Sequence, residues 1–282
     1  MIKISDEYNE HFQGGEFSSP KKNLGNKLFI YSCCRIISNL MKYNLICPEN
    51  ALIRREKNYS GTYENEVFPF GSIMGRDEID LPIKTITDND IKILGSIENL
   101  LNHYPNHSFI SYSYYSKYEY IKPYMSMVRE MYSSLIKEKR NDNSIVLMLR
   151  NSRDDGRFVL PDDYYINILE KENFDNVYVS LDHIHMHGTI LKKLEKYNPT
   201  LIDGSILDVF KEVTSFNTIV GSQGTFSFWA CLLSNANKIY WPLTNEGPNS
   251  NNSQFGEHVN LIVDDDPRYE FIKINNIYQN NI

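Results

Sequence analysis

The sequence predicts an α/β protein whose regular half is a parallel sheet covered by helices on both faces. Three observations support this fold class. From about residue 144 onward, short β-branched or apolar runs alternate with longer amphipathic segments, as in a chain of β-α units. The first run, residues 144–150, is apolar almost throughout, which is typical of a strand buried on both faces. The length of 282 residues is enough for two domains.

The alternation resolves into five strands and four helices. The first strand is Ser144–Arg150, and the helix after it opens at Pro161 with two acidic residues in its first turn. The other strands are predicted at residues 176–180, 200–203, 218–221 and 238–242, and the other helices at 189–194, 207–213 and 225–233. This succession predicts a Rossmann-like domain.

The first half is less regular. A helix is predicted over Lys27–Leu40, whereas the Tyr- and Asn-rich residues 100–125 receive no assignment. A polar segment at residues 138–143 separates the halves. We therefore expect an N-terminal domain over residues 1–140 and a C-terminal domain over residues 141–282.

Composition excludes several functional classes. The chain has 29 Lys+Arg and 36 Asp+Glu, a formal net charge of −7, and no basic run, which argues against nucleic acid as the main partner. Its four cysteines are too few and too clustered for a disulfide framework, so we expect reduced thiols and a cytoplasmic protein. We find no secretory-signal pattern and no run of 18 apolar residues, so any membrane association is expected to be peripheral.

Candidate ligand-binding residues follow the predicted strands, because ligands of open parallel sheets sit beyond the carboxyl ends of the strands. Arg150 ends the first strand, Asp182 follows the second, Asp203 ends the third, and residues 221–225 join the fourth to its helix. In that last segment, two glycines would let the backbone approach a phosphate and Thr225 could donate its hydroxyl. A tight turn with a capping Ser or Thr explains the same residues.

Arg150 is the candidate for gripping a diphosphate and stabilising charge on a leaving phosphate. Arg153 and Arg157 add positive charge close by. The alternative is a surface arginine paired with Asp154 or Asp155.

Two patterns suggest a metal ion. His183, His185 and His187 would share one face of an extended segment, but no companion ligand has suitable spacing, and a solvated loop is the default. Asp264 and Asp266 form an Asp-x-Asp of the kind that holds a divalent ion against a nucleotide diphosphate, although a charged triplet before proline is usually a solvated turn. We expect no metal and no cofactor.

Four segments in order resemble the α-1,2-fucosyltransferase family. They are residues 23–29 (NLGNKLF), 160–165 (LPDDYY), 178–182 (YVSLD) and 223–233 (QGTFSFWACLL), and the likeness extends from about residue 22 to 243. The family's His-x-Arg-Arg-x-Asp signature is matched only by Arg150, because its His and second Arg are missing. Lys27 replaces a Gln of the first motif, and Gly224 replaces the first Ser of the last.

The resemblance implies a GT-B-like fold, in which two Rossmann-like domains face a central cleft, with the acceptor on the N-terminal domain and the donor on the C-terminal one. It implies an inverting, metal-independent transfer of fucose or a related deoxyhexose from a nucleoside-diphosphate donor, GDP-linked by analogy, to a glycan hydroxyl. Arg150 would be catalytic. The donor-binding residues would be Gly25, Asn26, Arg153, Asp182, Asp203, Ser222, Gln223, Gly224 and Thr225.

Three questions stay open at this point. The general base is not identified among Glu16, Asp154 and His11. A metal-dependent transferase using Asp264 and Asp266 is one alternative. A nucleotide- or glycan-binding module that has lost catalysis is the other, since part of the family signature is absent.

Overall fold

The computed structural model describes residues 1–5, 17, 24–49, 51–57, 62–75, 81–150, 159–181, 188–244 and 259–274. The chain divides into two compact units. The first comprises Met1–Arg54 and Asn65–Glu130, and the second comprises Arg55–Glu64 and Met131–Ile282. Each unit contains its own parallel sheet, so the predicted α/β class is confirmed.

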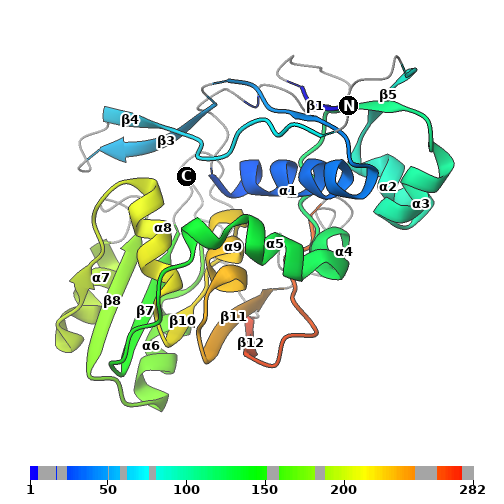
Figure 1. Ribbon diagram of the computed structural model, residues 1–282. Coiled ribbons are helices and arrows are strands. Elements are labelled where there is room, and N and C mark those ends of the chain that lie inside the picture. Colours follow the sequence, from blue (N-terminus) through cyan, green and yellow to red (C-terminus); the bar gives the residue numbers. More distant parts are fainter. Residues whose placement is uncertain are drawn as a thin grey trace, which may run out of the picture. The chain divides into compact units, whose positions relative to one another are not determined.

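The sheet of the second unit has six strands in the order β12-β11-β10-β7-β8-β9, all of them parallel (Figure 1). The five predicted strands are present as β7 (Ser144–Leu149), β8 (Asn176–Leu181), β9 (Thr200–Leu201), β10 (Thr218–Val220) and β11 (Lys238–Thr244). Numbered along the chain from β7, the order is 3-2-1-4-5-6, which is that of the Rossmann fold.

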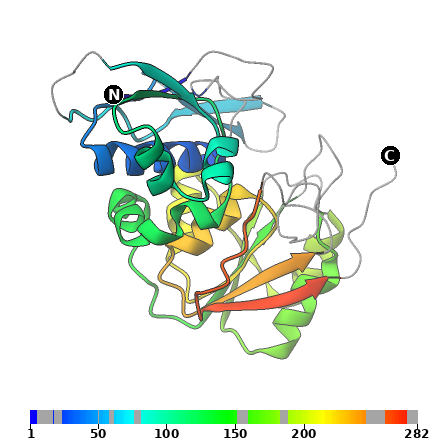
Figure 2. The same cartoon turned by 90° about the vertical axis from the view of Figure 1, so that its right-hand side faces the viewer.

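The sixth strand, β12 (Tyr269–Ile274), was not predicted. It pairs with β11 along the edge of the sheet, as the red and orange arrows in Figure 2 show. Its sequence, YEFIKI, mixes apolar and charged residues, because one side of an edge strand meets no neighbouring strand. The prediction of a five-stranded sheet was therefore one strand short.

Helices cover the sheet on both faces, as predicted. On one side α6 (Asp162–Lys171) packs with α7 (Gly188–Leu194), and on the other α8 (Ile206–Thr214) packs with α9 (Thr225–Leu233). The core on the α6 side joins alternate residues of β7 to apolar side chains of both helices: Ile145, Leu147, Leu149, Tyr164, Tyr165, Ile168, Leu169, Ile190 and Leu194. Every residue of β7 is buried, which explains why its sequence does not alternate.

The first unit contains a four-stranded parallel sheet in the order β2-β1-β6-β5. Its strands are β1 (Ile2–Ile4), β2 (Leu45–Ile46), β5 (Ile83–Ile86) and β6 (Ser108–Ser111). The predicted helix is α1 (Leu24–Met41), which begins three residues earlier than expected and packs against β1. Thirteen of its residues are buried, so its apolar pattern is less one-sided than that of a surface helix.

The remaining elements are short. They are β3 (Leu52–Lys57) and β4 (Thr62–Val67), which pair with each other, the helices α2 (Asp88–Leu94), α3 (Ile97–His103), α4 (Tyr118–Ile121) and α5 (Met125–Met131), and the 3-10 turns Lys122–Tyr124, Ser133–Leu135 and Glu195–Tyr197. Residues 100–125, which received no assignment from the sequence, thus belong largely to short helices and to the four-residue strand β6.

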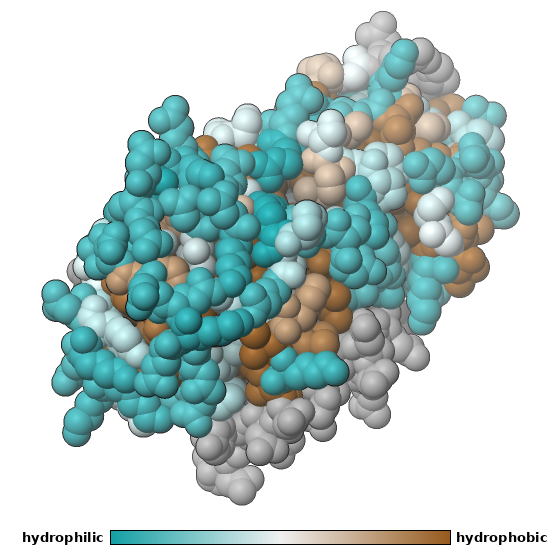
Figure 3. Space-filling view, turned by 90° about the horizontal axis from the view of Figure 1, so that it is seen from below, coloured by the Kyte–Doolittle hydropathy of each residue, from teal (hydrophilic) through white to brown (hydrophobic). Residues whose placement is uncertain are grey.

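The face shown in Figure 3 is mostly hydrophilic, with smaller apolar areas between the polar side chains. Among the described residues, no helix is long and apolar enough to span a bilayer. All four cysteines are buried and free, and burial raises the pKa of Cys34 and of Cys231 to about 12, so these thiols are neutral.

Candidate functional site

The order of the second sheet reverses direction between β7 and β10, and ligands of such sheets bind at this point. The two strands are neighbours, with Leu147 paired to Val220. Arg150 leaves the carboxyl end of β7, and the segment Gly221–Gly224 leaves the carboxyl end of β10 and leads into α9. Two of the segments singled out in the sequence are therefore brought together by the strand order.

Arg150 contacts this segment directly. Its Nη1 donates a hydrogen bond of 2.9 Å to the backbone carbonyl of Gln223. An ideal Cβ on Gly224 would lie only 1.7 Å from the same nitrogen, so the guanidinium rests against the backbone of Gly224. Among the described residues, no carboxylate pairs with Arg150. The charge of this half-buried guanidinium is thus available to an anion.

The loop beneath Arg150 is held in place by aromatic side chains of the sheet and of α6. The hydroxyl of Tyr164 lies 3.0 Å from the carbonyl oxygen of Gly221 and 3.1 Å from that of Tyr240, and shares its proton between them. Burial raises the pKa of Tyr164, so the hydroxyl remains a neutral donor. An ideal Cβ on Gly221 would lie 2.5 Å from Cε3 of Trp241, which leaves room for glycine only.

Ser222 continues this fixed segment. Its backbone N–H donates to Oγ of Ser227 on α9 at 2.9 Å, and both side chains are buried. Ser222 was predicted to bind the donor, and its backbone ties the loop to the first turn of α9.

Gln223 is completely buried, and within the described part of the chain neither its amide nitrogen nor its amide oxygen has a hydrogen-bond partner. A buried amide without partners costs roughly 1–3 kcal/mol for each unsatisfied group. Such groups are expected where a ligand or an ordered water completes the site. The unsatisfied amide of Gln223 therefore indicates that a ligand or an ordered water supplies hydrogen bonds next to Arg150.

The amino terminus of α9 adds a second positive element. Gly224 is its N-cap, no side chain caps it, and its first turn contains no acidic residue. By contrast, α6 has Asp162 and Asp163 in its first turn, and α8 is capped by Ser205. The positive end of the α9 dipole is therefore not offset by a neighbouring acid in the helix, and Thr225 begins the helix there. Together with Arg150, this arrangement can bind a phosphate or diphosphate.

The other predicted site residues fall in three places. Asp203 follows β9, two strands away from β7, where its Oδ1 accepts a hydrogen bond of 2.8 Å from the backbone N–H of Gly204. Gly25 and Asn26 lie in the first turn of α1 in the first unit, next to Lys27, whose buried ammonium group donates to the carbonyl of Phe17. The remaining candidates lie outside the described residues: Arg153, Arg157, Asp182, His183, His185, His187, Glu16, Asp154, Asp155 and His11.

Asp264 and Asp266 lie close before β12, and thus at the amino-terminal edge of the sheet, opposite to Arg150. Both oxygens of Asp266 accept hydrogen bonds from Arg268, Oδ2 at 2.6 Å from Nη2 and Oδ1 at 3.0 Å from Nε. Arg268 also donates to the carbonyl of Ser234 after the end of α9, at 2.6 Å. Asp266 of the Asp-x-Asp pattern therefore belongs to a structural clamp, and no group of three or more potential metal ligands occurs among the described residues.

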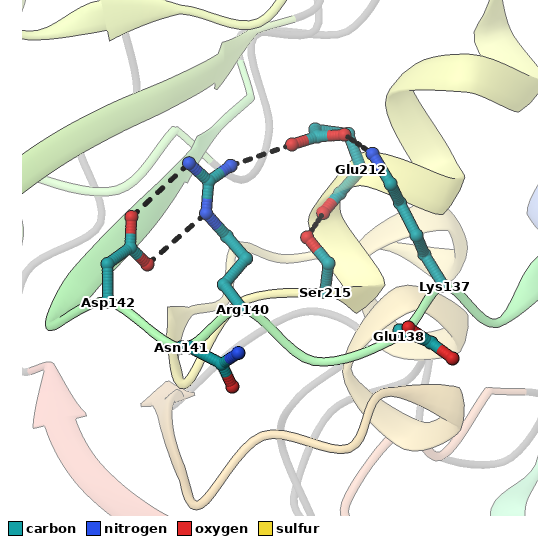
Figure 4. A pocket seen from close by; sticks show the side chains of 7 residues that line it. All are labelled: Lys137, Glu138, Arg140, Asn141, Asp142, Glu212 and Ser215. Atoms are coloured by element: carbon teal, nitrogen blue, oxygen red, sulfur yellow. Dashed lines mark hydrogen bonds and ion pairs between the residues drawn. The ribbon is translucent and has the colours of Figure 1, made fainter.

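A hollow at the same amino-terminal edge is lined by charged residues of the segment before β7 and by the end of α8 (Figure 4). Arg140 contacts Glu212 at 2.8 Å and Asp142 at 3.3 Å, and Lys137 pairs with the same Glu212. The guanidinium of Arg140 also lies 4.5 Å from the ring centre of Tyr178. Because these charges are already paired, the hollow lacks the available charge that Arg150 offers.

No protein-family model matches the chain, and no curated protein matches it significantly. Among solved structures, it is similar to POFUT1 in complex with GDP-fucose, with 11% sequence identity and a TM-score of 0.44 over 84% of this chain and 96% of that one. The apo form of POFUT1 matches with 12% identity and a TM-score of 0.42 over 82% and 93% of the two chains.

Two residues of the site were not recognised from the sequence. Tyr164 and Trp241 support the loop through contacts that depend on the packing of α6 and β11. Gly221, which the sequence singled out for the approach of a phosphate, is also required by the ring of Trp241. The signal available in the sequence was a Tyr in the first turn of a helix and a Trp within a strand, both ordinary core residues.

Proposed function

We propose that this protein is a glycosyltransferase that moves fucose or a related deoxyhexose from a GDP-linked donor to a glycan hydroxyl, with inversion and without a metal ion. The observation that carries the proposal is the position of the Arg150 guanidinium. It lies at the amino terminus of α9, which no side chain of its N-cap residue caps, at the point where the strand order of the sheet reverses direction. Among the described residues, it has no carboxylate partner. The four motifs that resemble the α-1,2-fucosyltransferase family support the same class of reaction.

In this reaction, the anomeric carbon would pass through an oxocarbenium-like state while negative charge builds on the departing diphosphate. Arg150 would stabilise that charge, together with the backbone amides of Gly224 and Thr225 and the hydroxyl of Thr225. Because the loop is held from below by Tyr164, these donors would be in place before the reaction. Asp182 or Asp203 would accept hydrogen bonds from the ribose or the base.

Other parts of the proposal concern residues away from this loop. Arg153 and Asp182 would complete the donor site in the domain at residues 141–282. The domain at residues 1–140 would carry the acceptor side, with Gly25 and Asn26 contributing to the donor from the first turn of α1. The protein would act in the cytoplasm, with peripheral membrane association where its glycan acceptor is attached to a lipid.

The donor is tested by thermal denaturation with GDP, UDP, dTDP and CMP and their common sugars. A ligand at 100 times its Kd stabilises by about 2.7 kcal/mol, which corresponds to a rise in Tm of roughly 5–10 °C. We expect this rise with GDP and its loss in Arg150→Ala. The matched control is Arg140→Ala, which should lower the starting Tm by removing ion pairs and leave the nucleotide response intact. Equal responses of Arg150→Ala and the parent would remove Arg150 from the donor site.

A second candidate is a nucleotide-binding module without catalysis, favoured by the missing His and second Arg of the family signature. It predicts that GDP binds as above, while neither sugar transfer nor slow hydrolysis of the donor occurs with any acceptor pool. Detectable hydrolysis of GDP-fucose that disappears in Arg150→Ala would eliminate it.

A further inference from the structure

Gly224 has a backbone conformation that other residues rarely adopt. Its φ of +123° and ψ of 164° lie in a region that is essentially restricted to glycine. The three atoms nearest to an ideal Cβ at this position all belong to Arg150: Nη1 at 1.7 Å, Cζ at 2.8 Å and Cδ at 3.5 Å. The space that a side chain would fill at residue 224 is therefore occupied by the guanidinium of Arg150.

The same nitrogen of the guanidinium is also held by the main chain. Nη1 donates to the carbonyl of Gln223, and this bond joins residues 73 positions apart. The carbonyl is part of the loop that Tyr164 and Trp241 fix from below. A guanidinium has five N–H donors, so four remain for a ligand after this bond is made.

A free arginine side chain samples many rotamers, and ordering it on binding costs about 0.5–1.5 kcal/mol. A contact that orders it beforehand removes that cost. In the family that the chain resembles, the corresponding residue is Ser. The Cβ of a Ser at position 224 would already clash with the guanidinium of Arg150 in its present position.

We propose that Gly224 is a positioning residue for Arg150: the absent side chain forms the slot that holds the guanidinium, together with the Gln223 carbonyl, over the amino terminus of α9 before an anion binds. This inference rests on the proposed function only in taking the bound anion to be the diphosphate of a nucleotide sugar. Gly224 itself touches Arg150 and needs no contact with the sugar.

The experiment measures Kd for GDP and for inorganic pyrophosphate in the full chain. The variants are Gly224→Ala, Arg150→Ala and the double variant. Gly188→Ala is the matched control, because a Cβ at Gly188 meets no atom of the described residues within 4 Å. We expect Gly224→Ala to weaken both ligands about tenfold or more, as for the loss of a charged hydrogen bond. Gly188→Ala should match the parent. In the Arg150→Ala background, Gly224→Ala should add little further loss, because the clash is gone.

The outcomes separate this inference from the proposed function. If GDP binds and Gly224→Ala binds it as tightly as Gly188→Ala does, the positioning role is refuted and the donor proposal stands. If pyrophosphate binds with the expected dependence and no nucleotide does, the positioning role stands and the donor proposal fails. If the parent binds neither, both fail.

Folding of the variants is decided by Tm without ligand. A Gly224→Ala chain that folds only when Arg150 is also Ala supports the slot, because only the clash with Arg150 has been removed. A double variant that is as unstable as Gly224→Ala alone refutes the slot and assigns the defect to the backbone conformation.

Discussion

The hydroxyl of Tyr164 offers a test of how the candidate site is supported. Tyr164→Phe removes one oxygen from a completely packed region and leaves the carbonyl of Gly221 without this partner, whereas the carbonyl of Tyr240 keeps its bond from the N–H of Gly221 at 2.8 Å. One buried carbonyl left unsatisfied costs about 1–3 kcal/mol. At roughly 2–4 °C per kcal/mol, we expect Tm to fall by roughly 2–12 °C.

The neighbouring tyrosine provides the matched control. Tyr165 is as buried as Tyr164, and its hydroxyl donates to the carbonyl of Met148 within β7 at 3.0 Å, away from the loop. Tyr165→Phe should therefore lose a similar amount of stability. Only Tyr164→Phe should also weaken the response to GDP, because it alone loosens the carbonyl of Gly221, three residues before Gly224. Thermal denaturation of both variants, with and without GDP, measures the two effects together.

Two results would refute this reasoning. If Tyr164→Phe keeps the Tm of the parent, its hydroxyl does not support the loop. If both variants lose the same stability and respond equally to GDP, the loop is held by other contacts, and the rigidity that we attribute to Tyr164 is not needed for binding.

Three further predictions concern other buried or charged groups. Gln223→Met should raise Tm in the absence of ligand, because it replaces an unsatisfied buried amide by an apolar side chain of similar size; a lower Tm would mean that the amide is satisfied in solution. A hydrogen bond of 2.6 Å from the hydroxyl of Ser144 is the main reason why the pKa of Asp142 lies below its ordinary value of 3.8. The ionised carboxylate therefore stabilises the folded state above pH 3.8. This stabilisation is lost as the pH falls through the lowered pKa. Acid denaturation should therefore begin at a higher pH in Asp142→Asn, and identical acid midpoints would show that the bond contributes nothing. Asp266→Asn should lower Tm, because it weakens the clamp with Arg268, and should leave the rise in Tm with GDP unchanged in excess chelator. If chelator abolishes the rise in Tm with GDP, the alternative of a metal-dependent transferase is supported.

Local sequence pattern was sufficient for the elements whose burial is uniform. β7 and α9 are apolar almost throughout because both are buried on nearly all sides. The start of α6 was predicted from a proline followed by two acidic residues. The shorter or exposed elements were missed for the opposite reason. β12 has charged residues because it lies at an edge, and β2 has only two residues, too few for any periodicity.

The candidate site shows the same division between local and non-local information. The sequence by itself placed Arg150 at the end of a strand and a glycine segment before a helix, because each feature depends on neighbours a few residues away. Only the tertiary structure decided that the two meet. In the described part of the chain, three α-helices and two strands separate β7 from β10, and the two strands become neighbours through the sheet order. It also decided that Arg268 joins Asp266 to the carbonyl of Ser234 at the opposite edge, and that the missing side chain of Gly224 is the space for Arg150. Hydrogen bonds and steric contacts act over about 3 Å, so they are settled by where the folded chain brings atoms together, which no local pattern specifies.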